Sequence, residues 1–318
     1  MHTGKTFFPS GLKMAAAGGA TWLVLLAGVI LSFSQLTIFD LLFLLAPWVV
    51  VPLALSLVPK QASSLSEVSR LVARYLLLPG AALTTASFFV KDGPAAGTLV
   101  CLWLLVAVAL ALDGLERLIR GRLHSFPEFC FAFGEGYALV GALWLLASRV
   151  GLRPFAFREP IVLLTAIHFH YAGLMASILA GLTASSMRTP LSLRMALSCA
   201  VVGPGLLGLA FLAGPKLKLA AVGLMVIGEC AIVSATFRIG LAEARGMGGR
   251  MLLVGGACVI VGMALAAIWA LGEYPLHAFV KLEQMARYHG VLNSVGFGLC
   301  SLVGWTLLER KPVPEESR

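Results

Sequence analysis

Apolar stretches of about 20 residues recur along almost the whole chain, and short polar segments separate them. Each stretch is long enough to cross the roughly 30 Å of hydrocarbon in a bilayer as an α-helix. Because backbone polar groups inside hydrocarbon must be bonded within their own segment, helices are the expected structure. The pattern predicts an all-α, polytopic transmembrane helix bundle in which residues 1–318 form a single integral membrane domain. The predicted spans lie near 16–36, 38–58, 74–90, 95–112, 127–148, 160–184, 191–213, 217–237, 251–271 and 288–308.

Basic residues between the spans predict the orientation of the bundle. Placing the N-terminus in the cytoplasm puts 16 of the 24 Lys and Arg residues on the cytoplasmic side. Cytoplasmic loops of membrane proteins carry an excess of Lys and Arg. With an even number of spans, both termini are expected in the cytoplasm.

Proline and glycine interrupt two spans in a way that suggests an internal repeat. Pro47 and Pro52 fall in the second predicted span, and Pro204 lies between glycines in the seventh. Paired interruptions in corresponding helices are typical of transporters built from inverted repeats. The pattern therefore suggests two inverted five-helix halves.

The composition agrees with a membrane protein. It argues against a soluble domain, a nucleic-acid-binding protein and a chain held by disulfides or a thiolate-bound metal. The chain is 59% hydrophobic and 12% charged, whereas soluble domains carry roughly twice that charge. The net charge of +9 comes from short caps between apolar runs, so we expect the lipid bilayer as a partner and no nucleic acid. Six cysteines lie in apolar segments without CxxC spacing, which indicates neither disulfides nor a thiolate metal site.

Two histidines lie inside the sixth predicted span. At a rise of about 1.5 Å per residue, His168 and His170 are roughly 12 and 15 Å deep. Residues two apart on a helix point about 200° from each other, so the pair should contact different neighbours. Ionisable residues at such depth usually face a bundle interior or a pathway, although each can also be a packed core residue.

Further polar residues lie at similar depth in other spans. Glu135, flanked by two glycines, and Glu229 are carboxyl groups well inside predicted spans. In the last span His289 and Asn293 share a face at spacing four, and an amide inside hydrocarbon needs hydrogen-bond partners. Tyr171 shares the face of His168. In contrast, the spacing-four charges of Asp113, Glu116, Arg117 and Arg120 predict an exposed cytoplasmic helix end.

The segments HFHYAGL (168–174) and HGVLNSVGFG (289–298), in a chain of about ten spans, resemble the YndJ-like family of bacterial membrane proteins. The resemblance implies a bacterial inner-membrane location and singles out His168, His170, His289 and Asn293 for testing. It implies no reaction.

Three functions fit these features. The first is a proton-coupled secondary transporter, in which Glu135 or Glu229 carries the proton, His168 and His170 relay it, and Asn293 orients the substrate. The second is a membrane-embedded enzyme acting on a lipophilic substrate. In that case His168, His170, His289 and Glu135 are the catalytic candidates as metal ligands or general acid and base, and Asn293, Tyr171 and Glu229 bind substrate. The third is a structural protein whose polar groups only join helices. The sequence identifies no cofactor and leaves a metal open.

Overall fold

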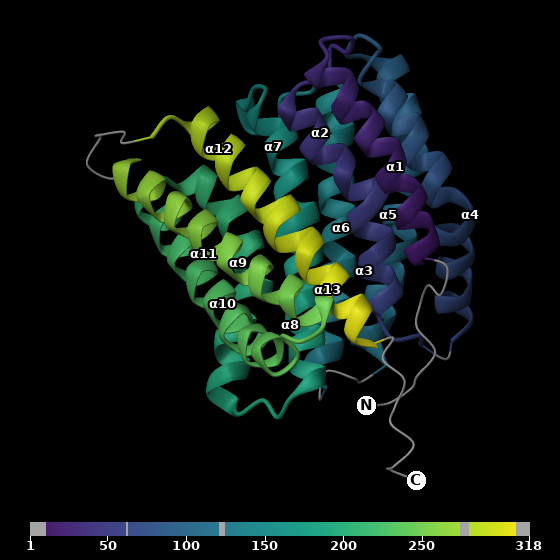
Figure 1. The fold of residues 1–318 in the computed structure, drawn as a ribbon. Helices are drawn as coiled ribbons and strands as arrows, with labels where there is room; N and C mark the ends of the chain where they lie inside the picture. Colours follow the sequence, from purple (N-terminus) through teal and green to yellow (C-terminus); the bar gives the residue numbers. More distant parts are fainter. Residues whose placement is uncertain (1–10, 62, 121–124, 274–279, 310–318) are drawn as a thin grey trace.

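A computed structural model describes residues 11–61, 63–120, 125–273 and 280–309, and these form a helical bundle (Figure 1). The single-segment helices are α1 (Gly11–Ile30), α4 (Ser64–Ser87), α5 (Pro94–Ile119), α6 (Phe126–Val150), α9 (Leu191–Ala213), α10 (Pro215–Ala242) and α11 (Met247–Glu273). The other three long helices each contain a π-helical centre: α2–η1–α3 (Ile38–Leu45, Ala46–Val50, Val51–Leu57), α7–η4–α8 (Ile161–His168, Phe169–Met175, Ala176–Ser186) and α12–η5–α13 (Leu282–Val291, Leu292–Leu299, Cys300–Glu309). The predicted helical bundle is therefore confirmed.

Nine of the helical stretches in the described residues are long and apolar enough to span a membrane. Large apolar side chains face outward on them, for example Val24, Leu105 and Leu209, which are 71%, 54% and 63% exposed. A surface this apolar is suited to lipid contact. The tenth long helix, α4, is less apolar than these nine because Glu67, Arg70 and Arg74 occupy its first half.

Several helices extend past the predicted spans. The α4 helix begins at Ser64, ten residues before the predicted residue 74, because the Ser63 side chain caps it by accepting from the Ser66 N–H. The α5 helix continues to Ile119 instead of ending near 112. Hydropathy marks only the part of a helix suited to hydrocarbon, whereas capping and backbone hydrogen bonds decide where the helix ends.

The three π-helical segments lie at the centre of the bundle, where each contacts the other two. In η1 the cause is clear in the sequence, because Pro47 has no N–H to donate to the preceding turn. The segments η4 and η5 include three glycines of the two motifs, Gly173 in η4 and Gly296 and Gly298 in η5. Such π segments are frequent at functional sites.

Packing in the bundle repeats every four helices. The α4 helix packs against α5, and α5 packs against α6. The α6 helix also packs against α7–η4–α8. The α9, α10 and α11 helices repeat this arrangement, and α11 packs against α12–η5–α13. In Figure 1, α2, α7 and α12 lie at one end of the bundle, and α3, α8 and α13 lie toward the other. The π segments thus fall in the second, sixth and tenth helices, at intervals of four. The two inverted five-helix halves suggested by the sequence stay a prediction.

Candidate functional site

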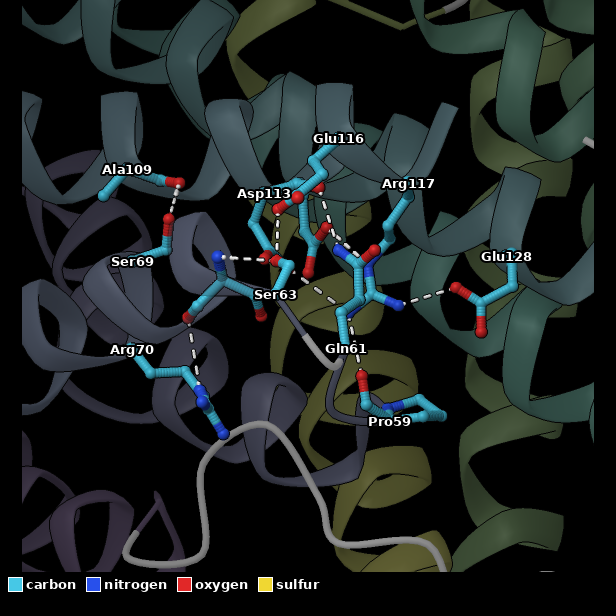
Figure 2. Close-up of polar contacts among 12 residues, drawn as sticks. Pro59, Gln61, Ser63, Ser69, Arg70, Ala109, Asp113, Glu116, Arg117 and Glu128 are labelled. Carbon is cyan, nitrogen blue, oxygen red and sulfur yellow. Dashed lines mark hydrogen bonds and ion pairs between the residues drawn. The ribbon is translucent and has the colours of Figure 1, made fainter. Parts of the chain in front are cut away.

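Arg117 is the centre of a buried ion-pair network at the end of the bundle where α3 ends and α4 begins (Figure 2). Its guanidinium donates to Glu135 Oε2 at 2.9 Å and to Glu128 Oε2 at 2.7 Å, both on α6. It also donates to the Pro59 carbonyl at 2.8 Å and lies 3.3 Å from Asp113 Oδ2. One cation is therefore shared by three carboxyl groups, in a place where Arg117 is 1% exposed.

Close approach of α5 and α6 brings these groups together. A Cβ atom on Gly114 would lie 2.6 Å from the Ala132 carbonyl oxygen, so only glycine permits this contact. The loop before α4 covers the network, because Gln61 donates to the Asp113 carbonyl at 3.1 Å and Ser63 donates to Glu116 Oε2 at 2.5 Å. The network fastens the end of α3 to α5 and α6.

The prediction that this charged segment is an exposed helix end is wrong for Asp113, Glu116 and Arg117, which are all buried. Spacing-four charges look the same on an exposed and on a buried face. The signal that pointed toward a buried face was Glu135 on the neighbouring helix, because buried acids are commonly paired with a cation. In the structure Glu135 forms its ion pair with Arg117 and does not contact the histidines.

His170 lies in the buried core of the helical bundle. Its Nδ1–H donates to the Ala166 carbonyl at 2.8 Å, and its Nε2 accepts from Trp103 Nε1 at 3.3 Å. Its ring packs edge-on against Phe43 with centroids 5.1 Å apart, and stacks on Trp103 at 5.8 Å. Both ring nitrogens are used and the side chain is fully buried, so the contacts of His170 are those of a packed residue.

The other five candidates surround one cavity of about 400 Å³ between α7–η4, α9, α10, α11 and α12–η5. Pockets that bind small molecules have this order of size. The cavity extends from the end of the bundle opposite the Arg117 network, where Phe155 and Leu282 line it, to the π segments at the centre. The candidates in its wall are His168, Tyr171, Glu229, His289 and Asn293.

Most polar groups of the cavity wall already bind backbone carbonyls. His168 Nε2–H donates to the Pro204 carbonyl at 3.1 Å, and His289 Nδ1–H donates to the Gly262 carbonyl at 2.8 Å. Because the carbonyls only accept, these bonds assign the proton to those nitrogens. Asn293 Nδ2 then donates to His289 Nε2 at 2.9 Å, and Tyr171 Oη donates to the Leu42 carbonyl at 2.8 Å.

Two buried acceptor atoms of the wall have no partner among the described residues. They are Glu229 Oε2 and Asn293 Oδ1. Glu229 is only 5% exposed, and it has no ion pair with a described residue. It therefore differs from Glu135, whose charge is held by Arg117.

Four aromatic rings form a continuous apolar wall on the cavity. Trp144 and Phe157 have centroids 6.5 Å apart, Phe157 and Phe211 are 6.4 Å apart, and Phe211 and Trp269 are 6.3 Å apart. Lys218 Nζ lies 5.0 Å from the centroid of Phe211 and 5.7 Å from that of Trp269. Sequence analysis missed this wall because its rings come from four separate segments and aromatic residues are frequent throughout the spans.

Metal-ligating side chains do not converge in the part of the chain that the structure describes. No group of three His, Cys, Asp or Glu residues there lies close enough together to hold an ion. The six cysteines are all unpaired thiols.

Comparison with known proteins agrees with the resemblance in the two histidine motifs. The family model described as YndJ-like protein matches residues 41–297. The chain is also similar to the "Uncharacterized membrane protein YndJ" of Bacillus subtilis (strain 168), with 27% identity over 223 residues. That alignment covers 70% of this chain and 40% of the relative, so more than half of the relative's length lies outside the match. No solved structure matches the chain. The match over most of its length shows that the chain belongs to the YndJ-like family of membrane proteins.

Proposed function

We propose that this membrane protein is a proton-coupled secondary transporter, with the cavity as its substrate site and Glu229 as the group that carries the proton. The observation that carries the proposal is the environment of Glu229. It is a buried carboxyl group in a membrane-spanning helix, it lines a cavity, and one of its oxygens has no partner. Intramembrane carboxyl groups of this kind mark ion and proton pathways.

Glu229 suits this role better than Glu135. Proton uptake by Glu135 would break its 2.9 Å ion pair with Arg117, which fastens α5 to α6. Proton uptake by Glu229 breaks no ion pair with a described residue. His168 lines the same cavity, and the ring nitrogen that does not bond Pro204 can exchange a proton with a substrate or with water in it.

The packing also supplies two blocks that could move relative to each other. The α4–α6 helices form one block, which the Arg117 network fastens, and α9–α11 form the other. The helices with π-helical centres lie between them. Irregular helix centres next to a substrate site are typical of transporters that open alternately to the two sides.

We place the protein in a bacterial inner membrane with both termini in the cytoplasm. The basis is the distribution of Lys and Arg, which favours the end of the bundle that holds the Arg117 network. In this orientation the cavity opens toward the outside.

The proposal can be tested without knowing the substrate. Sealed proteoliposomes are incubated with a bacterial metabolite and lipid extract under an imposed pH gradient, and the trapped compounds are identified by mass spectrometry. We expect at least one compound to accumulate unchanged, to be lost when the gradient is collapsed, and to be lost with Glu229→Gln.

The alternative of an enzyme acting on a lipophilic substrate gives a different result in the same experiment. A compound that disappears while a new product forms, independently of the gradient, would overturn the transporter proposal. The enzyme would then use His168 or His289 as general acid or base.

A further inference from the structure

The cavity has unsatisfied acceptors but few available donors. Glu229 Oε2 and Asn293 Oδ1 are both buried without a partner, and both residues line the cavity. A buried acceptor without a donor is costly, so a ligand that donates hydrogen bonds to these atoms recovers that loss.

The N–H groups of the polar wall are already engaged. His168 Nε2–H and His289 Nδ1–H donate to backbone carbonyls, and Asn293 Nδ2 donates to His289. In neutral imidazole the remaining ring nitrogen is itself an acceptor. The wall is therefore poorly equipped for a carboxylate or phosphate and well equipped for a group rich in N–H or O–H.

The charge of the wall points in the same direction. Among the described residues that line the cavity, Glu229 is the one carboxyl group, and none is Lys or Arg. The rest of the lining is apolar, dominated by the aromatic wall of Trp144, Phe157, Phe211 and Trp269. Near the end of this wall the Lys218 ammonium lies over two of the rings, so the same rings already hold one ammonium group.

We propose that the cavity binds an amphipathic amine, with its apolar body along the aromatic wall and its ammonium group at Glu229 and Asn293. This inference rests on the proposed function, since it names the substrate class of the same site. A volume of about 400 Å³ accommodates a molecule of this type with a single alkyl chain or a small ring system.

The test measures equilibrium binding in lipid nanodiscs. Three probes share a decyl chain brominated near its end and differ only in head group, which is a primary ammonium, an alcohol or a carboxylate. Bromine quenches nearby tryptophan fluorescence, and Trp144 and Trp269 both line the cavity. Quenching is taken relative to a Trp144→Phe, Trp269→Phe double variant, which removes the signal of probe dissolved in the lipid.

We expect the ammonium probe to bind most tightly and the carboxylate probe least tightly. Glu229→Gln should weaken the ammonium probe about 10-fold or more and leave the alcohol probe within about threefold, because only the charged hydrogen bond is lost. The matched control is Glu283→Gln. It makes the same chemical change at an exposed position on α12 that does not line the cavity, and it should alter neither probe.

Two results would overturn the inference. One is a carboxylate probe that binds as tightly as the ammonium probe. The other is a folded Glu229→Gln protein with unchanged ammonium affinity. If Glu229→Gln does not fold, Asn293→Asp replaces it. This variant adds a carboxylate at the second acceptor and should favour the ammonium probe over the alcohol, and an unchanged preference would count against the inference.

Failure of this inference can be told apart from failure of the transporter proposal. The binding measurement uses no gradient, so an amine can bind to a protein that does not transport it. Gradient-driven accumulation of a compound without an amine would overturn only the proposal that the ligand carries an ammonium group. The transporter proposal would stand.

Discussion

Replacing Arg117 with methionine is expected to destabilise the protein by about 3–5 kcal/mol or to prevent its folding. Arg117 is 1% exposed, and its removal leaves the carboxyl groups of Asp113, Glu128 and Glu135 without their cation. The cost comes mainly from leaving charges buried and unpaired. Thermal unfolding of the detergent-solubilised protein, followed by fluorescence, measures the difference.

Arg120→Met is the matched control for this variant. Arg120 is three residues away on the same helical path, but its side chain is 54% exposed and its ion pair is with Glu116. Water reaches the Arg120 side of this pair, and the Ser63 hydroxyl still donates to Glu116 when Arg120 is removed, so the melting temperature should fall much less than with Arg117→Met. Equal effects of the two substitutions would show that the Arg117 network is not a buried structural centre. Arg117→Lys should recover only part of the stability, because an ammonium cannot reproduce the planar fork that reaches four oxygens.

The second large effect is expected for Gly141→Ala. An added Cβ would lie 2.5 Å from His170 Nδ1, the atom that donates to the Ala166 carbonyl. The imidazole must then move within a fully buried site between Phe43 and Trp103, and overpacking of this kind costs about 1–3 kcal/mol. The melting temperature of the variant should fall accordingly.

Gly136→Ala provides the control on the same helix, because no atom lies within 4 Å of the added Cβ. Alanine favours a helix over glycine by up to about 1 kcal/mol, so this variant should be unchanged or more stable. Combining Gly141→Ala with His170→Ala should cost less than the sum of the two single effects, since the clash is then removed. Strict additivity would mean that Gly141 does not contact His170.

The sequence predicted the helices better than their ends. Apolar stretches located every long helix, because each must shield its backbone from hydrocarbon. The start of α4 was missed, since polar residues form its first turns and the Ser63 cap sets its beginning. The π-helical centres were also missed, except for the prolines of η1. The segments η4 and η5 contact each other and η1, and contacts between helices distant in sequence leave no local pattern in the chain.

The candidate site could be predicted in part. Spacing on single helices singled out His168, Tyr171, His289 and Asn293, and hydropathy singled out Glu229, and all of them line one cavity. The partner of each polar group could not be predicted. His170 is bonded to Trp103 and Glu135 to Arg117, and both partners come from α5. Such pairs follow from the packing of whole helices, which local periodicity does not specify.

Whether Glu229 couples the cavity to proton movement can be measured by comparing substrate exchange with substrate accumulation in proteoliposomes. The probe is a compound found to accumulate in the extract experiment, in labelled form. Exchange of internal for external substrate requires binding and the conformational change but no proton gradient, whereas accumulation requires all three. Both are measured at saturating substrate, so that weaker binding does not limit the variant, and we predict that Glu229→Gln then retains exchange and loses gradient-driven accumulation. A Glu229→Gln protein that accumulates the compound as the unmodified protein does would show that Glu229 does not couple the cavity to proton movement.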